Sequence, residues 1–245
     1  MASIHTRIDL KNLGRIMGVW AHPDDDTYSM AGIMAAAIQN GQEVVVVTAT
    51  RGEAGVQDEA RWPAAKLGGI RSREMAAALT VLGVKHHHWL DYPDGGCAYS
   101  DQKEAVGRIA ELIRTYKPES ILTFGPEGMT GHDDHRTVSR WVGEAIQLSG
   151  SSAVIYHAIN THKQYEALLD ADKQFNIFFN IDKPPVCDGS QCVIHFELDD
   201  SLYEKKLAAL HAMPSQTEAM LTVFRDSLRD SLGVEAFTYA RRTKE

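Results

Sequence analysis

Residues 16–25 read IMGVWAHPDD, a short apolar run that passes directly into a polar turn. An apolar run of this length followed by polar residues is typical of a buried strand that ends at a loop. In open α/β sheets, ligands bind at the carboxyl ends of the strands. The loop offers one imidazole and two carboxylates, from His22, Asp24 and Asp25, and these donors suit a zinc-type metal.

A second polar cluster follows another apolar run. Residues 120–124 read SILTF, and His132, Asp133, Asp134 and His135 come shortly afterwards. Each cluster alone also fits a helix N-terminus, where Asp accepts hydrogen bonds from free N–H groups and complements the helix dipole. Two strand ends that both deliver metal-compatible side chains favour a hydrolytic metal site. Three protein ligands and one open position would define a catalytic zinc centre.

Strand-like and helix-like segments alternate through the first 150 residues. Apolar runs of strand length are separated by segments with apolar side chains at helical spacing, and Gly or Pro follows several of the helices. This alternation predicts a Rossmann-like α/β fold, a mostly parallel sheet with helices on both faces. The expected strands are 16–20, 43–50, 86–90 and 120–124, the expected helices are 29–40, 72–82, 104–116 and 133–148, and a long loop is expected over 51–69.

The last third of the chain has a different pattern. Strand-like segments lie at 154–159, 175–181 and 193–198, and one helix is expected at 202–213. No linker-like stretch or fixed-period repeat divides the chain. We therefore expect a single domain over 1–245, with a core at about 15–150 and a C-terminal extension at about 151–245 that adds strands and a helix. The loop at 51–69 and the segment 160–192 are expected to shape a substrate pocket.

Composition limits the classes of partner. The chain has 245 residues and a net charge of −8, which argues against a nucleic-acid partner. No apolar stretch approaches the ~20 residues of a membrane-spanning helix, and the polar N-terminus has no signal-peptide h-region. Cys97, Cys187 and Cys192 cannot form a disulfide framework, so we expect reduced thiols and a cytoplasmic location. Cys187 and Cys192 also lack the second pair that a structural zinc site needs.

Five motifs in a fixed order resemble one family. The chain carries AHPDD at 21–25, TRGEAG at 50–55, RSRE at 71–74, YPDGG at 92–96 and GHDDH at 131–135, and the segment from Lys206 to Ser215-Gln216 resembles the family's C-terminal helix. Together they resemble the LmbE-like, PIG-L superfamily of zinc-dependent de-N-acetylases, over roughly residues 15–220. The family includes deacetylases of the mycothiol and bacillithiol pathways and of glycosylphosphatidylinositol synthesis. The resemblance implies hydrolysis of the amide of an N-acetylated amino sugar, such as N-acetylglucosamine, or of its conjugate.

The resemblance also implies a metal site. By motif position, His22, Asp25 and His135 would bind one divalent ion, zinc or iron in its place. Asp24 would be the general base that takes a proton from the attacking water. A bound zinc ion would lower the pKa of water to about 7 and polarise the carbonyl.

Further roles follow from the same motifs. His132 would stabilise the oxyanion or protonate the departing amine, and Asp134 would orient that imidazole and raise its pKa. Arg71 and Asp94 would bind polar groups of the substrate at the pocket rim. A salt bridge that ties two loops together is the structural alternative for this last pair.

Four positions depart from the family pattern. Asp26 stands where a glutamate is usual, Asp133 where a proline is usual, Met213 where many members carry a histidine, and Thr130 where some relatives place a tyrosine. A first helical turn accepts Asp133 easily. The metal chemistry survives these changes, whereas the identity of the substrate does not follow from the motifs.

Two other functions share parts of this pattern. A nucleotide-binding oxidoreductase would have the same sheet, but it needs a Gly-rich turn after the first strand, where this chain has residues 21–24, AHPD. A non-catalytic metal- or sugar-binding protein would keep the ligands without needing a base, and the presence of Asp24 disfavours it. The sequence leaves open whether the chain forms a homo-oligomer.

Overall fold

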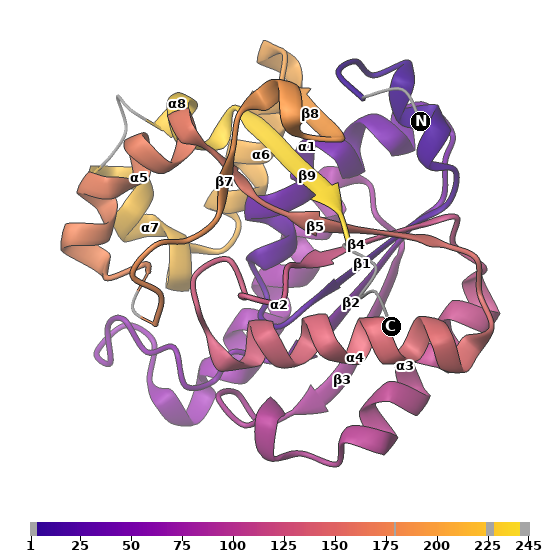
Figure 1. Ribbon diagram of the computed structural model, residues 1–245. Coiled ribbons are helices and arrows are strands. Elements are labelled where there is room, and N and C mark those ends of the chain that lie inside the picture. The colour runs from indigo at the N-terminus through magenta and orange to yellow at the C-terminus, as the bar shows by residue number, and fades with distance from the viewer. Residues whose placement is uncertain (1–3, 179, 224–227, 241–245) are drawn as a thin grey trace.

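A seven-stranded sheet runs through the computed structural model, which describes residues 4–178, 180–223 and 228–240 (Figure 1). The strand order is β3-β2-β1-β4-β5-β9-β8. The first five strands of this order pair in parallel, and β9 pairs antiparallel with both β5 and β8. The strands are β1 Ile16–Trp20, β2 Val44–Thr50, β3 His86–Tyr92, β4 Ser120–Phe124, β5 Val154–Ala158, β8 Ile194–Glu197 and β9 Val234–Tyr239.

The central strands are apolar because helices cover both of their faces. Every residue of β1, β2 and β4 is buried, as expected for inner strands of a parallel sheet. Helices α1, α2 and α6 pack together on one face, and α3 and α4 pack on the other (Figure 1). The helices are α1 Asp25–Gln39, α2 Ala64–Leu82, α3 Gln102–Tyr116, α4 Asp133–Ser149, α5 His162–Phe175, α6 Asp200–His211, α7 Pro214–Val223 and α8 Leu228–Leu232, and the 3₁₀ turns are η1 Asp9–Leu13, η2 Cys97–Tyr99 and η3 Gly189–Gln191.

The pairing of β1 with β4 decides where the functional side chains meet. Ile16 is in register with Ser120 in this parallel pair. The two strands therefore end side by side, and the loops that follow them, 21–24 and 125–132, lie at the same edge of the sheet. This edge is where ligands collect in open α/β folds.

The predicted α/β class is confirmed, and several C-terminal details are not. Residues 175–181 were expected to form a strand, but Phe175 ends α5 and Asn176 caps it in a left-handed conformation with φ of 50°. Helix α2 begins at Ala64, inside the expected loop 51–69. The sequence did not predict several C-terminal elements. These are the two-stranded sheet of β6 (Asn160–Thr161) and β7 (Val186–Cys187), the helices α5, α7 and α8, and strand β9.

The expectation of three reduced cysteines is wrong for two of them. Cys187 and Cys192 form a disulfide across the short turn η3, with their Cα atoms 6.5 Å apart. Three cysteines are too few for a framework of several disulfides, but this does not exclude a single bridge between two cysteines five positions apart. Cys97 is a buried free thiol.

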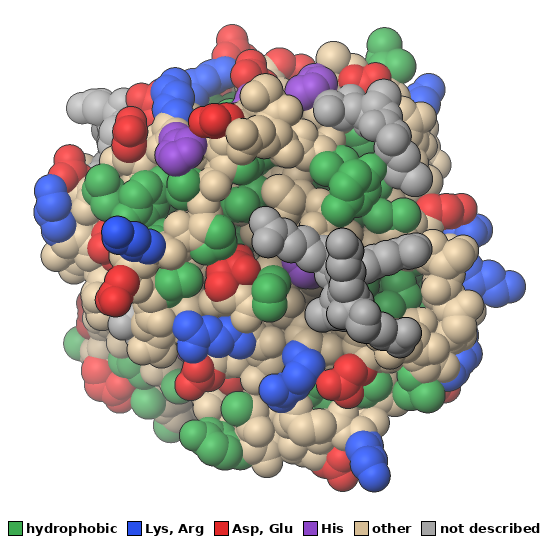
Figure 2. All heavy atoms as spheres, in the orientation of Figure 1, with side chains coloured by type: hydrophobic (Ala, Val, Ile, Leu, Met, Phe, Trp, Pro, Cys, Tyr) green, Lys and Arg blue, Asp and Glu red, His purple; other side chains and the backbone are tan. Residues whose placement is uncertain are grey.

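The surface carries charges of both signs. On the face shown in Figure 2, Lys and Arg side chains are interspersed with Asp and Glu, and hydrophobic side chains lie between them. Within the described part of the chain, no helix is long and apolar enough to cross a membrane.

Candidate active site

His22, Asp25 and His135 meet where β1 and β4 end. The Nδ1 atom of His22 lies 3.1 Å from Nε2 of His135. The Asp25 carboxylate completes a triangle, with Oδ2 3.5 Å from His22 Nδ1 and Oδ1 3.4 Å from His135 Nε2. Two imidazole nitrogens and a carboxylate oxygen are a donor set that zinc accepts at a catalytic centre. The structure thus brings together the three side chains that the sequence predicts as metal ligands.

The second nitrogen of each imidazole faces an oxygen atom of the protein. Nδ1 of His135 lies 2.9 Å from the carbonyl oxygen of Gly128, to which it can donate its proton. Nε2 of His22 lies 3.1 Å from Asp94 Oδ1 and 3.4 Å from Asp134 Oδ2. The Gly128 contact draws the ring proton of His135 away from the triangle, so that His135 Nε2 presents a lone pair toward it. The contacts of His22 Nε2 with Asp94 and Asp134 are ion-pair distances without hydrogen-bond geometry. Such outer acceptors are the usual partners of metal-binding histidines, so the residues present fit a divalent metal.

The electrostatics of the triangle also favour a cation. Burial acts to lower the pKa of His22, but the carboxylates of Asp134, Asp25 and Asp94 outweigh it and raise that pKa well above its usual value. Burial acts to raise the pKa of Asp25, but His135 and His22 hold it well below its usual range. In the absence of an ion, positive charge is therefore stabilised at the place where the ligand atoms converge.

His132 is near enough to compete as a ligand. A ring nitrogen of His132 lies within 4.8 Å of those of His22 and His135. The residue is also the N-cap of α4, where its Nδ1 accepts a hydrogen bond from the backbone N–H of Asp134 at 3.1 Å. This contact leaves Nε2 of His132 as its proton-bearing nitrogen. The sequence assigns His132 to catalysis, and the distances alone do not separate that role from ligation.

Asp134 contacts His22 as well as His132. Its carboxylate is fully buried and accepts hydrogen bonds from the backbone N–H groups of Gly95 (2.7 Å) and Cys97 (3.0 Å), besides facing His22. Its backbone N–H donates to Nδ1 of His132. The expected rise in the pKa of His132 is not found, because burial and the charge of His22 lower it while Asp134 offsets them only in part.

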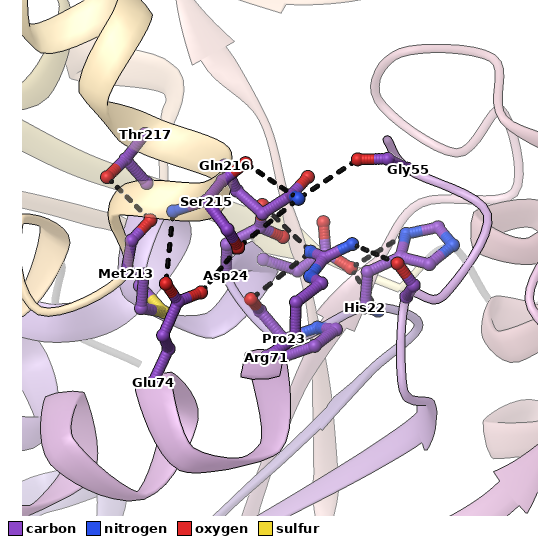
Figure 3. Close-up of polar contacts among 12 residues, drawn as sticks. His22, Pro23, Asp24, Gly55, Arg71, Glu74, Met213, Ser215, Gln216 and Thr217 are labelled. Carbon is purple, nitrogen blue, oxygen red and sulfur yellow. Dashed lines mark hydrogen bonds and ion pairs between the residues drawn. The ribbon is translucent and has the colours of Figure 1, made fainter. Parts of the chain in front are cut away.

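Arg71 and Asp24 form a pair beside the triangle. Nη2 of Arg71 lies 3.2 Å from Asp24 Oδ2, and the same guanidinium donates to the carbonyl oxygens of Gly52 and Pro23 (Figure 3). The expectation of a rim residue is wrong for Arg71, which is only 4% exposed. Gly52 leaves room for it: a Cβ there would stand 2.0 Å from Nη1, and φ is +65°. Burial raises the pKa of Asp24, whereas Arg71 lowers it.

Asp94 supports His22 from the turn after β3. Besides the contact with His22, its Oδ2 accepts a hydrogen bond from the backbone N–H of Ala54 at 2.8 Å. These two partners hold the pKa of Asp94 down to about 2, although burial acts to raise it. Asp94 and Arg71 both line the cavity described next, so their contact with a substrate stays a prediction.

A cavity of about 490 Å³ opens from the triangle. This volume is in the range of small-molecule sites. One part of its wall carries the polar residues of the site, and another part is apolar and comes from the C-terminal third of the chain. Gln216, which lines the cavity, donates from Nε2 to the carbonyl oxygen of Gly55 and so ties α7 to the loop after β2 (Figure 3).

Sequence comparisons agree with the geometry. A 1D-myo-inositol 2-acetamido-2-deoxy-alpha-D-glucopyranoside deacetylase of Thermobispora bispora is 29% identical over 264 residues, which cover 91% of this chain and 87% of the relative. An enzyme of the same name from Mycobacterium sp. (strain KMS) is 34% identical over 154 residues, and there the match spans 54% of this chain and half of the relative's length.

A solved structure shares the fold. The N,N'-diacetylchitobiose deacetylase of Pyrococcus horikoshii, in complex with an inhibitor, superposes with a TM-score of 0.66 over 94% of this chain and 85% of its own, at 22% identity. The family model of GlcNAc-PI de-N-acetylase, PIG-L, matches residues 17–146. Because this match covers more than half of the chain and contains both ligand clusters, the protein belongs to the PIG-L de-N-acetylase family.

Proposed function

We propose that the protein is a metal-dependent amide hydrolase that removes the N-acyl group of an amino sugar or its conjugate, as an N-deacetylase. The triangle of His22 Nδ1, Asp25 and His135 Nε2, with the Asp24 carboxylate beside it at the wall of the cavity, carries the proposal. Relatives named as deacetylases of a 2-acetamido sugar support the substrate class.

The metal is proposed to be zinc, with iron as the alternative that the same donors accept. His22, Asp25 and His135 would hold it. When bound, it would polarise the amide carbonyl and lower the pKa of a water. The supporting observations are the Gly128 carbonyl oxygen, which accepts from the outer nitrogen of His135, and the Asp94 carboxylate, which lies 3.1 Å from the outer nitrogen of His22.

Asp24 is proposed to act as the general base. Burial raises the pKa of its carboxylate, which strengthens it as a base, and Arg71 keeps it oriented and charged. It would accept the proton of the attacking water and later pass it toward the leaving nitrogen. Asp24 is not part of the triangle of ligand atoms, so it can take a proton without losing the metal.

His132 is proposed to stabilise the tetrahedral oxyanion. Since Nδ1 accepts from the backbone N–H of Asp134, Nε2 carries the proton and can donate it into the cavity that His132 lines. A donor fixed in this way acts on charge that develops only near the transition state.

Turnover decides between this function and a binding protein of the same fold. Purified protein loaded with one equivalent of zinc should release acid and free amine from at least one N-acylated glucosamine or glucosamine conjugate. A protein that binds these compounds but hydrolyses none of them would be a sugar-binding protein instead. Asp133→Asn is a matched control for variants of Asp24, because Asp133 is exposed and pairs with Arg136 on the surface.

A cytoplasmic location also stays a proposal, resting on the low number of cysteines. The Cys187–Cys192 bond bears on it, because structural disulfides are rare in reducing compartments. Cell fractionation that finds the chain with cytoplasmic markers would support the proposal, and recovery from an oxidising compartment would contradict it.

A further inference from the structure

The cavity at the triangle has an apolar half. Its wall there is formed by side chains from the segment after β5, from α5 and the turn after it, and from α7 and α8. These side chains are Ile159, Leu168, Ile177, Phe178, Met220 and Leu232. Five of the six are only partly buried, so they are not packed away in the core. Covering a solvent-facing apolar wall with an apolar ligand removes both surfaces from water, which favours binding.

Most of the apolar half lies on the other side of the triangle from the polar half; the exception is Met220, because α7 contacts α2 and the loop after β2. The polar lining comes from the loops that follow β2 and β3, including Gly55 and Asp94, and from Arg71 of α2. In the sheet, β2 and β3 lie on one side of β1, and β5 and β9 lie beyond β4 on the other side. The triangle, built at the ends of β1 and β4, therefore stands between them.

The two parts of an amide substrate bound at the triangle, its acyl chain and its amine, would lie in different halves of the cavity. Its carbonyl carbon must lie at the site of attack, so the acyl chain and the amine extend from it in different directions. An amino sugar needs polar partners for its hydroxyl groups, and Arg71, Asp94 and the loop after β2 offer them. Polar residues also lie beside the apolar half, but Gln164 and Glu235 among them are already bonded within the protein. The acyl chain then points into the apolar half.

Resting on the proposed function, we propose that the substrate carries an N-acyl chain longer than acetyl, a medium-length alkanoyl group bound by the apolar half of the cavity. The reaction is hydrolysis: water adds its oxygen to the carbonyl carbon, the C–N bond breaks, and the products are an alkanoic acid and the free amine. An acetyl group alone would leave the side chains of α5, α7 and α8 uncovered.

A chain-length series tests the proposal. Rates of amine release are measured for N-acetyl-, N-butanoyl-, N-hexanoyl- and N-octanoylglucosamine with the zinc-loaded protein. Burial of a methylene contributes about 0.8 kcal/mol, which is about fourfold. The value of kcat/KM should therefore rise by on the order of 10²-fold from acetyl to hexanoyl. Octyl glycosides of N-acetylglucosamine, which place the same chain on the sugar instead, should show no comparable gain.

Two neighbouring leucines of α5 supply a variant and its control. Leu168 lines the cavity, whereas Leu169 is 37% exposed and does not. Leu168→Trp should shorten the apolar half and reduce the ratio of kcat/KM for the octanoyl substrate to that for the acetyl substrate by tenfold or more. Leu169→Trp should leave the ratio of the two substrates as in the parent protein. Binding of octanoate compared with acetate, measured by calorimetry, should show the same dependence on Leu168.

The outcomes separate this inference from the proposed function. Hydrolysis of the acetyl substrate with no gain along the series would overturn the inference and leave the function standing. A gain that follows the octyl glycoside rather than the acyl chain would also overturn it, because the apolar half would then bind the aglycone. Failure to hydrolyse any amide of the series would overturn both.

Discussion

The ammonium group of Lys206 lies 2.9 Å from the carboxylate of Glu235, and both side chains are fully buried. The pair bridges a break in α1, where Met30 has non-helical angles of φ −146° and ψ 18°. Glu235 accepts hydrogen bonds from the backbone N–H groups of Gly32 and Ile33, and Lys206 donates to the carbonyl oxygen of Tyr28. In a regular helix these groups would bond to the backbone four residues away.

The ion pair thus completes the backbone hydrogen bonding at the break and fixes the first turn of α1. That turn begins at Asp25, and Tyr28 and Ser29 line the cavity. The C-terminal third of the chain, which supplies Lys206 and Glu235, therefore holds the turn that carries Asp25, a proposed metal ligand.

Removal of one partner of this pair should be strongly destabilising. Lys206→Met leaves the Glu235 carboxylate buried without its counter-charge, and the free energy of unfolding should fall by about 3–5 kcal/mol. Urea unfolding of the variant measures this loss. Lys205→Met, one position earlier on the same helix, removes the same group from a more exposed site and should cost less than about 1 kcal/mol. Equal losses in the two variants would contradict the role of the pair.

Replacement of the proposed base should separate rate from metal content. Asp24→Asn keeps the size of the side chain and its contact with Arg71 but cannot accept the proton. The rate should fall by on the order of 10²–10⁴, the usual contribution of general acid–base catalysis. Metal content by elemental analysis should stay at the parent level. Loss of the metal together with activity would instead identify Asp24 as a ligand, and Asp133→Asn should change neither quantity.

The role of Asp94 can be read from metal affinity. Because its carboxylate faces Nε2 of His22, Asp94→Ala should weaken metal binding by about 10–100-fold, as loss of an outer partner of a ligand does. A competition titration with a chelator measures this. Asp91→Ala serves as the control, since Asp91 pairs with Arg51 at the surface. An unchanged affinity with a raised KM would restore Asp94 to the substrate-binding role that the sequence predicts.

His87 should make stability depend on pH. Burial lowers its pKa to about 4, and the nearby charges of His88 and Arg51 act in the same direction. The unfolded chain, with an ordinary His pKa near 6.5, therefore binds more protons between about pH 6.5 and 4. The free energy of unfolding should fall as pH drops through that window. His87→Gln should lose less stability than the parent between pH 7 and pH 5 in urea titrations; identical losses would contradict the assignment.

The sequence predicts that His22, Asp25 and His135 lie together because their positions depend on local signals. Apolar runs of strand length predict β1 and β4, and the polar residues that follow them predict that His22 and His135 lie near two strand ends. The pairing of Ile16 with Ser120 then brings the turns together, as parallel strands of one sheet require.

The supporting contacts were not predictable because they depend on tertiary packing. Nothing in the motif around Asp94 shows that its carboxylate reaches His22 across the sheet, or that Arg71 is buried against Asp24. Strand β9 adds antiparallel to a parallel sheet from the far end of the chain, and its Glu235 finds a partner in α6. Periodicity identifies segments, but it does not identify the partner that a buried charge will meet.

The zinc content of single variants is the most direct test of which side chains bind the metal. In the proposed site, His22, Asp25 and His135 bind one divalent ion and His132 acts beside it. Zinc content should be one per chain in the parent and in His132→Ala, and well below one in Asp25→Ala and His135→Ala. Full stoichiometry in Asp25→Ala together with loss of zinc in His132→Ala would contradict the account, because the metal would then be held by three histidines instead.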